Sequence, residues 1–264
     1  MSLVFAAIAP HPPQLSQEPN PGSSDQLQKT RQAYHTLAQQ LYAAKPDLLV
    51  ILSPHEGAIP AAWEITVGET LKGDLKEFSD FSAQLEVPGS IAFSHRLKER
   101  AEDHRFPLLL QSGQQLDYAT VLSAMQTMPH LPNARLVSLM VANTNNRAQY
   151  EFGKMLREEI FATNERVAVL ASANLSYKRG KNSPAGYTPK ASALDARIME
   201  ALLQGDEKAI LHISNEEAEE AKMLGLGPLS LLLGVLYRKH FFGRILAYEY
   251  PFGVGYCTCI LETH

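Results

Sequence analysis

Two apolar segments that each end in a Pro-His pair constrain the fold of this chain more than any other feature. One segment ends at Pro10-His11 and the other at Pro54-His55. Each has the length and apolar content of a buried strand, and proline closes each one because it cannot continue a sheet ladder. Ligands of α/β proteins bind at the carboxyl ends of the sheet strands. We therefore expect both imidazoles to face one site.

The two histidines admit two interpretations on the residues alone. Neutral imidazole is the commonest metal ligand among side chains, so His11 and His55 could together bind a metal ion. Alternatively, they are two unrelated histidines that each follow a strand. The pattern by itself leaves both interpretations open.

The order of the predicted elements indicates the fold class. A strand at Val4–Ala9, an amphipathic helix at Gln26–Ala44 and a strand at Leu48–Leu52 form a βαβ unit with a right-handed crossover. Further buried strands are predicted at Arg135–Val141 and Arg166–Ala171, and polar residues follow each of them. Helices are also predicted at Ile91–Asp103, Leu116–Met128, Gln149–Phe161, Ala191–Leu203, Glu207–Ile213, Glu216–Met223 and Leu229–Lys239.

The remaining strand-like segments predict two hairpins. Arg244–Tyr250 and Val254–Leu261 flank a Pro-Phe-Gly turn and predict an antiparallel pair at the end of the chain. Trp63–Val67 and Leu85–Val87 are hypothesised to form a hairpin excursion near the site. No linker or repeat divides the sequence. We therefore predict one α/β domain over residues 1–264, with three αβα layers around a central, mostly parallel mixed sheet and with a C-terminal antiparallel hairpin.

Composition excludes several classes of function. The chain has 264 residues, a net charge of −4 and an isoelectric point near 6.1, so no nucleic-acid partner is expected. Its only cysteines, Cys257 and Cys259, form no disulfide framework, which favours a reducing compartment. The N-terminal apolar stretch is too short for a signal peptide or a membrane span. We expect a soluble, cytoplasmic protein with no membrane partner.

Several further motifs carry a family resemblance. They are Leu116-Asp117-Tyr118, the segment from Ala171 to Arg179, Ala185-Gly186-Tyr187, the segment from Leu231 to Leu236, and the segment from Tyr250 to Tyr256. Together with the Pro-His segments they span nearly the whole chain. The chain resembles the catalytic B subunits of class III extradiol ring-cleaving dioxygenases and the wider group that includes the Memo proteins. In that family two histidines and one carboxylate hold a ferrous ion and leave three positions open for substrate and oxygen.

The resemblance implies a set of metal ligands. His11 and His55 match the two histidine ligands. The carboxylate is expected near Met223, and Glu220 lies one helical turn earlier on much the same face, which makes it the candidate third ligand. The alternative for Glu220 is a solvated helix face, and a thioether at Met223 would suit cuprous copper better than ferrous iron. Fe(II) is the expected metal, with zinc, copper or no metal as alternatives.

The resemblance also shows where this chain departs from the family. Tyr177 stands in place of the histidine that serves as acid and base, and Asn174 stands where an aspartate is common. Tyr118 replaces a second active-site histidine, which is usually paired with the aspartate at Asp117. An unperturbed phenol titrates at about pH 10 and is a weak base at neutral pH. We expect Asp117, Tyr118, Asn174 and Tyr177 to line the substrate site.

The matches to the family and the departures from it are compatible with three functions. The first is a non-haem metal enzyme that opens a small aromatic diol with dioxygen. The second is a Memo-like protein that keeps the fold and pocket but binds a peptide, a small ligand or a metal without ring cleavage. The third is another oxidation or a metal-assisted hydrolysis with tyrosine as the proton donor. Since family members often associate, a homo-oligomer is also expected.

Overall fold

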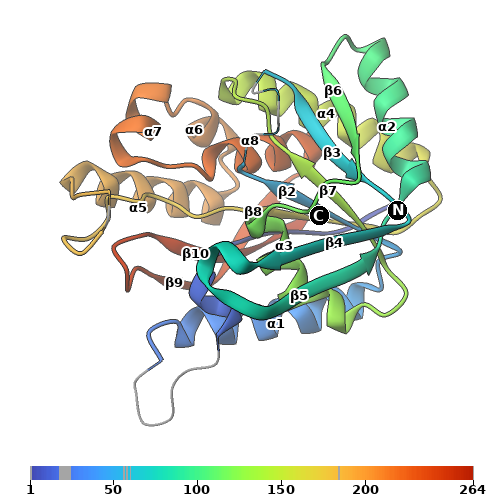
Figure 1. Ribbon diagram of the computed structural model, residues 1–264. Helices are drawn as coiled ribbons and strands as arrows, with labels where there is room; N and C mark the ends of the chain where they lie inside the picture. The colour runs from blue at the N-terminus through green and yellow to red at the C-terminus, as the bar shows by residue number, and fades with distance from the viewer. Residues whose placement is uncertain are drawn as a thin grey trace.

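The computed structural model describes residues 2–17, 25–55, 57, 59, 61–183 and 185–263, whose strands build one eight-stranded sheet and one hairpin. The large sheet has the order β6-β3-β7-β2-β8-β1-β10-β9 (Figure 1). Its strands are β1 (Leu3–Ala9), β2 (Leu48–Ser53), β3 (Trp63–Val67), β6 (Leu108–Ser112), β7 (Arg135–Met140), β8 (Val167–Ser172), β9 (Phe241–Glu249) and β10 (Tyr256–Thr263).

Helices cover both faces of this sheet, which is why the central strands are apolar throughout. The helices are α1 (Gln28–Ala44), α2 (Ile91–Asp103), α3 (Tyr118–Thr127), α4 (Asn146–Ala162), α5 (Pro189–Gln204), α6 (Glu207–Leu211), α7 (Asn215–Ala221) and α8 (Leu226–Val235). One core packs beneath α2, α4, α5 and α8, and the other beneath α1 and α3. Every residue of β2 is buried between the two cores, as expected for a strand covered on both faces.

The strand pairings confirm the predicted fold class. The parallel pairs at the centre of the sheet are β7 with β2, β2 with β8, and β8 with β1. β10 pairs antiparallel with both β1 and β9. The three αβα layers, the mostly parallel mixed sheet and the C-terminal antiparallel hairpin are therefore all present. Parallel strands bring their carboxyl ends to one edge, and β1, β2 and β8 deliver the residues of the candidate site to that edge.

The hypothesised pairing of Trp63–Val67 with Leu85–Val87 is wrong. β3 lies inside the large sheet, parallel to β6 and antiparallel to β7. Burial of Trp63 explains this position, because its ring stacks on Phe152 with centroids 4.4 Å apart and its Nε1–H donates to Gln149 Oε1 at 2.8 Å. Apolar content alone could not assign the partner of this strand.

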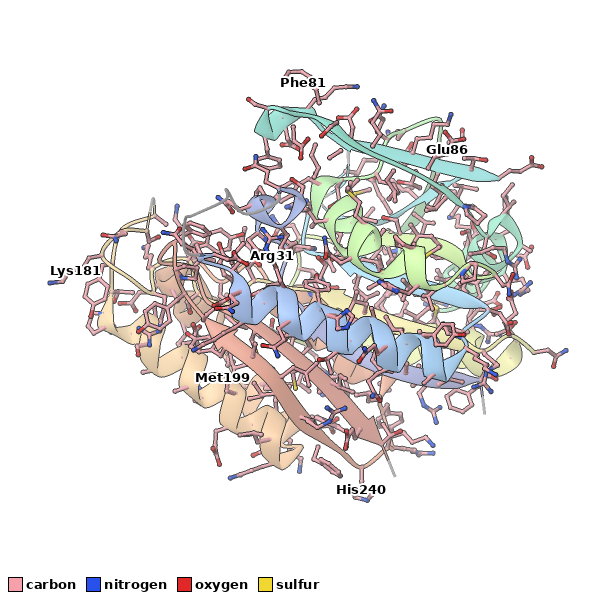
Figure 2. All side chains as sticks on the ribbon, turned by 90° about the horizontal axis from the view of Figure 1, so that it is seen from below. Arg31, Phe81, Glu86, Lys181, Met199 and His240 are labelled. Carbon is pink, nitrogen blue, oxygen red and sulfur yellow. The ribbon has the colours of Figure 1, made fainter. Side chains whose placement is uncertain are left out.

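Leu85–Val87 instead belongs to a separate two-stranded sheet of β4 (Thr70–Leu75) and β5 (Asp80–Pro88). The sequence did not predict β4 as a strand, because lysine, glycine and aspartate interrupt its apolar residues. The hairpin packs its buried leucines against α3. Figure 2 shows α1 and α3 on the same side of the sheet, with the strand that carries Phe81 and Glu86 at the outer margin. No helix in the described part of the chain has the length and hydropathy needed to span a bilayer.

Candidate functional site

The two histidines of the Pro-His segments meet at the carboxyl edge of the sheet. His11 follows β1 and His55 follows β2, and β8 lies between these strands. The centroids of the imidazole rings are 5.9 Å apart and the ring planes cross at 73°. The sheet order thus brings together two residues that are far apart in the sequence.

Ser172 orients the His11 ring. Ser172 Oγ lies 2.9 Å from His11 Nδ1 and donates to the carbonyl of Ala119 at 3.2 Å. Ser172 Oγ also lies 2.8 Å from Ser123 Oγ of α3, so this hydroxyl joins the His11 ring to α3. The other ring nitrogen, Nε2, is buried and has no hydrogen-bond partner among the described residues.

The His11 side chain is neutral in this environment. Burial and, to a smaller extent, the neighbouring His55 lower the pKa of the His11 imidazole to about 3, against a smaller opposing effect of Asp117. A neutral imidazole with one nitrogen anchored and the other unpartnered has the arrangement of a metal ligand.

Asp117 orients the second imidazole in the same way. Its Oδ1 lies 2.9 Å from His55 Nδ1, accepts from Ser53 Oγ at 2.7 Å and caps α3 by accepting from the backbone N–H of Ala119. Burial raises the pKa of the Asp117 carboxyl, but the bonds from His55, Thr120 and Ser53 outweigh burial and hold the pKa below its usual value. Because the ionised carboxylate only accepts, His55 donates its Nδ1–H to Asp117, and Nε2 is the nitrogen left for a ligand.

Tyr118, Asn174 and Tyr177 complete the candidate site. The Tyr118 ring centroid lies 4.4 Å from that of His55 and 5.8 Å from that of His11. Asn174 Oδ1 accepts from the backbone N–H of His11 at 2.9 Å, and its Nδ2 donates to Tyr177 Oη at 2.8 Å. The amide of Asn174 therefore ties Tyr177 to the loop that carries His11.

The hydroxyl groups of Tyr118 and Tyr177 lie close enough for each to affect the pKa of the other. Asn174 donates to Tyr177 Oη, and this bond lowers the pKa of Tyr177. Because Tyr177 Oη accepts from Asn174, the hydroxyl has its own proton left for a ligand. Burial nevertheless keeps the pKa of both phenols above the usual value, so both are protonated at neutral pH.

The structure does not bring the candidate third ligand, Glu220, to the histidines. Its carboxylate lies on α7, is 43% exposed and pairs with Lys190 Nζ of α5 at 2.9 Å. Glu217, one turn earlier, pairs with Arg197 of the same helix. α7 thus presents its acidic face to basic residues of α5. Within the described ranges, no three His, Cys, Asp or Glu side chains are grouped so that they could hold a metal.

Sequence reasoning missed the groups that hold the histidines in place. Ser53 and Ser172 are the last residues of β2 and β8, and each bonds to the anchoring network described above. Glu64 is fully buried on β3 and accepts from the backbone N–H of Ile59, in the loop that follows His55. A hydroxyl residue at the end of a buried strand was the available signal, since neighbouring strand ends lie side by side.

A buried carboxylate holds the segment that carries Asn174 and Tyr177. Asp195 Oδ1 accepts from the backbone N–H of Ser176 at 3.0 Å, and Oδ2 accepts from Tyr248 Oη at 2.6 Å. Arg179 donates to Tyr248 Oη at 3.1 Å. These bonds attach the segment to α5 and β9 immediately beside Tyr177.

The Asp195→Asn variant is expected to destabilise the fold by about 1–3 kcal/mol, because one buried donor loses its acceptor. It should also shift the resonance of the Tyr177 Cζ in ¹³C-tyrosine-labelled protein. Urea unfolding measures the first effect and NMR the second. Glu159→Gln is the matched control, since Glu159 is a buried carboxylate paired with Arg96 and Arg100 far from the site. An equal shift of the Tyr177 resonance in both variants would contradict a local role for Asp195.

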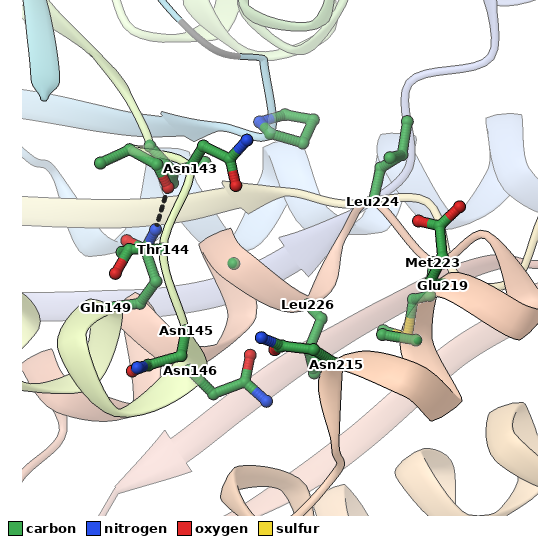
Figure 3. A pocket seen from close by; sticks show the side chains of 15 residues that line it. Asn143, Thr144, Asn145, Asn146, Gln149, Asn215, Glu219, Met223, Leu224 and Leu226 are labelled. Atoms are coloured by element: carbon green, nitrogen blue, oxygen red, sulfur yellow. Dashed lines mark hydrogen bonds between the residues drawn. The ribbon is translucent and has the colours of Figure 1, made fainter. Parts of the chain in front are cut away.

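A cavity of about 580 Å³ lies beside the histidines at the same sheet edge. Pro54, which precedes His55, forms part of its wall, as do residues that follow β7 and the segment at 223–227 (Figure 3). Met223 lines this cavity and pairs through its backbone with Ser176. The position that the resemblance assigned to a metal-binding carboxylate is therefore a cavity wall.

Comparison with known proteins agrees with this fold. Protein CA_C1420 of Clostridium acetobutylicum is 24% identical over 271 aligned residues, which cover 99% of this chain and 58% of that protein. The chain therefore spans less than two thirds of this curated relative. The crystal structure of the uncharacterized protein JW3007 from Escherichia coli K12 matches with a TM-score of 0.65 at 16% identity, covering 98% of this chain and 100% of that one. The latter match shows a shared fold.

The family model for the catalytic LigB subunit of aromatic ring-opening dioxygenase matches residues 5–258. This range includes both Pro-His segments, the Asp117 cap and the segment with Asn174 and Tyr177. The sheet edge, the paired histidines and the extent of this match lead to one conclusion: the chain belongs to the family of the catalytic LigB subunit of aromatic ring-opening dioxygenases.

Proposed function

We propose that the protein is a non-haem metal oxidoreductase that opens catechol-type aromatic rings with dioxygen. One observation carries this proposal: His11 and His55 both have Nδ1 anchored by a hydrogen bond, which leaves Nε2 of each ring for a metal. The unpartnered, buried His11 Nε2 fits a metal, because an unsatisfied buried polar atom is costly without one. Fe(II) is the metal that family membership favours.

The side chains around the histidines have distinct roles in this proposal. When bound, the ion acts as a Lewis acid and a template that orients the diol and dioxygen. Tyr177 donates its free hydroxyl proton in a hydrogen bond to a substrate oxygen, and Asn174 holds the phenol in place. Tyr118 and Phe78, whose rings meet edge to face at 4.8 Å, provide an apolar wall for the aromatic ring.

A second candidate function is a Memo-like protein that binds a ligand or a metal without ring cleavage. Two observations favour it. The described residues supply no carboxylate as a third ligand, and protonated tyrosines stand where the family has proton-transferring histidines. A tyrosine with a raised pKa donates hydrogen bonds well but accepts a proton poorly at neutral pH.

One experiment distinguishes the two functions. The full chain is loaded anaerobically with Fe(II), desalted and analysed for metal, and then mixed with a panel of catechols and air-saturated buffer. Ring-opened products, followed by absorbance and mass spectrometry, support the dioxygenase. Stoichiometric iron and catechol binding without product support the ligand-binding protein. Absence of both metal and catechol binding would overturn both.

A further inference from the structure

The residue roles proposed above leave the cavity that begins at Pro54 without a function. It lies at the carboxyl ends of β2 and β7, between the start of α4, the start of α7 and the start of α8 (Figure 3). Its volume of about 580 Å³ is sufficient for part of a small organic ligand.

Carboxamides dominate the polar lining of this cavity. They belong to Asn143, Asn145, Asn146, Gln149 and Asn215. Glu219 is the one ionisable side chain among the described lining residues, and neither lysine nor arginine is among them. A ligand here would meet both hydrogen-bond donors and acceptors, but no cation.

The carboxamides divide into structural and available groups. Asn145 caps α4 by accepting from Ala148 N–H, and Asn146 Nδ2 donates to the carbonyl of Ile213. Gln149 bridges the indole of Trp63 and the carbonyl of Ala142. These three therefore form the frame of the cavity.

Asn143 and Asn215 are different. Both side chains are exposed, and neither takes part in a hydrogen bond within the part of the chain that the structure describes. They come from different elements, the loop after β7 and the start of α7, and both line the cavity (Figure 3). Each offers an unused amide donor and an unused carbonyl acceptor to a ligand.

The cavity shares its walls with the histidine site. Pro54, which directly precedes His55 in the chain, lines the cavity. Met223 pairs with Ser176, the residue before Tyr177. At Gly225, a Cβ atom would lie 2.2 Å from the backbone oxygen of Asn174, so the two segments are in close contact. The cavity therefore adjoins the backbone segments that carry His55, Asn174 and Tyr177.

We propose that this cavity binds an uncharged, hydrogen-bonding substituent of the substrate, of the carboxamide or peptide-bond class. The inference rests on the proposed function and specifies its substrate further. An amide presents N–H donors and a carbonyl acceptor, which match the free groups of Asn143 and Asn215. A carboxylate presents only acceptors and would face Glu219 with no cation in the lining to offset the repulsion.

The test uses two catechols with the same linker, one ending in a carboxamide and the other in the isosteric carboxylate. Each is titrated calorimetrically into the Fe(II)-loaded full chain without oxygen, with unsubstituted catechol as the reference. The amide is expected to bind about tenfold more tightly than the carboxylate, the difference that one or two hydrogen bonds provide.

Three variants connect this preference to the cavity. Asn143→Ala and Asn215→Ala should each weaken amide binding several-fold and leave unsubstituted catechol unaffected. Glu219→Gln should strengthen binding of the carboxylate ligand and so reduce the difference in affinity between the amide and the carboxylate. Asn133→Ala is the matched control, because Asn133 is an exposed asparagine that lines a different cavity near the start of β7. It should change none of the three affinities.

The outcomes separate the two proposals. If unsubstituted catechol binds but the carboxylate binds as tightly as the amide or more tightly, the cavity inference is overturned and the proposed function stands. If the amide preference survives in both asparagine variants, the cavity is not its source and the inference is again overturned. If unsubstituted catechol does not bind to the loaded protein, both proposals are overturned.

Discussion

Replacing His11 with alanine is expected to abolish stoichiometric iron binding, and His55→Ala should have the same effect. The two imidazoles are the anchored nitrogen donors of the site, and each has its Nδ1 fixed by a partner. Mutation of such an outer partner already costs about 10- to 100-fold in metal affinity, so loss of a ligand should cost more than about a hundredfold. Metal analysis after anaerobic loading and desalting measures the effect.

Two further variants delimit this prediction. Asp117→Asn should weaken iron binding by about 10- to 100-fold, since it removes the charge that orients His55. Glu220→Gln should retain full iron occupancy, because Glu220 pairs with Lys190 at the surface of α5 and α7. Full occupancy in His11→Ala would show that the metal binds elsewhere. Loss of iron in Glu220→Gln would restore the role that sequence similarity gave to this carboxylate.

Replacing Gly153 or Gly234 with alanine is expected to destabilise the fold by about 3 kcal/mol, because overpacking of a close contact costs about 1–3 kcal/mol and here the obstacle is backbone. These glycines lie where α4 and α8 cross. A Cβ at Gly153 would lie 2.1 Å from the carbonyl oxygen of Leu231, and a Cβ at Gly234 would lie 2.1 Å from that of Tyr150. Neither carbonyl can rotate away, so the two helices would have to separate.

Urea unfolding of the purified variants measures this loss. Gly227→Ala is the control, because Gly227 lies in α8 with Gly234. A Cβ at Gly227 would have no atom nearer than 3.4 Å, an ordinary van der Waals distance. Alanine is the better helix former by about 1 kcal/mol, so Gly227→Ala should be neutral or stabilising. If Gly234→Ala unfolds at the same urea concentration as Gly227→Ala, the close crossing does not limit helix packing.

The meeting of His11 and His55 could be predicted because it follows from a simple rule. Each histidine follows a parallel strand, and the carboxyl ends of parallel strands share one edge of a sheet. The third ligand could not be predicted in the same way. Helical spacing places Glu220 on a face of α7, but it does not say which neighbour that face will meet. In the fold that neighbour is α5, whose Lys190 and Arg197 pair with the acidic residues.

Strand pairing shows the same limit. The apolar pattern of Trp63–Val67 indicates a strand correctly, but its place between β6 and β7 depends on Trp63 stacking against Phe152 of α4. Likewise, β4 is a strand because its buried leucines pack on α3 and its backbone pairs with β5. Its own sequence, interrupted by charged residues and glycine, gives a weak signal.

By itself, the sequence determined the fold class, the strand ends that carry the histidines and the family motifs around them, because these depend on local periodicity and on short segments. Only the tertiary structure decided what holds the histidines. Ser172 anchors His11 from 161 residues away, and Asp117 anchors His55 from 62 residues away. A hydrogen bond depends on distance and direction in space, and the spacing of residues along the chain does not contain that information.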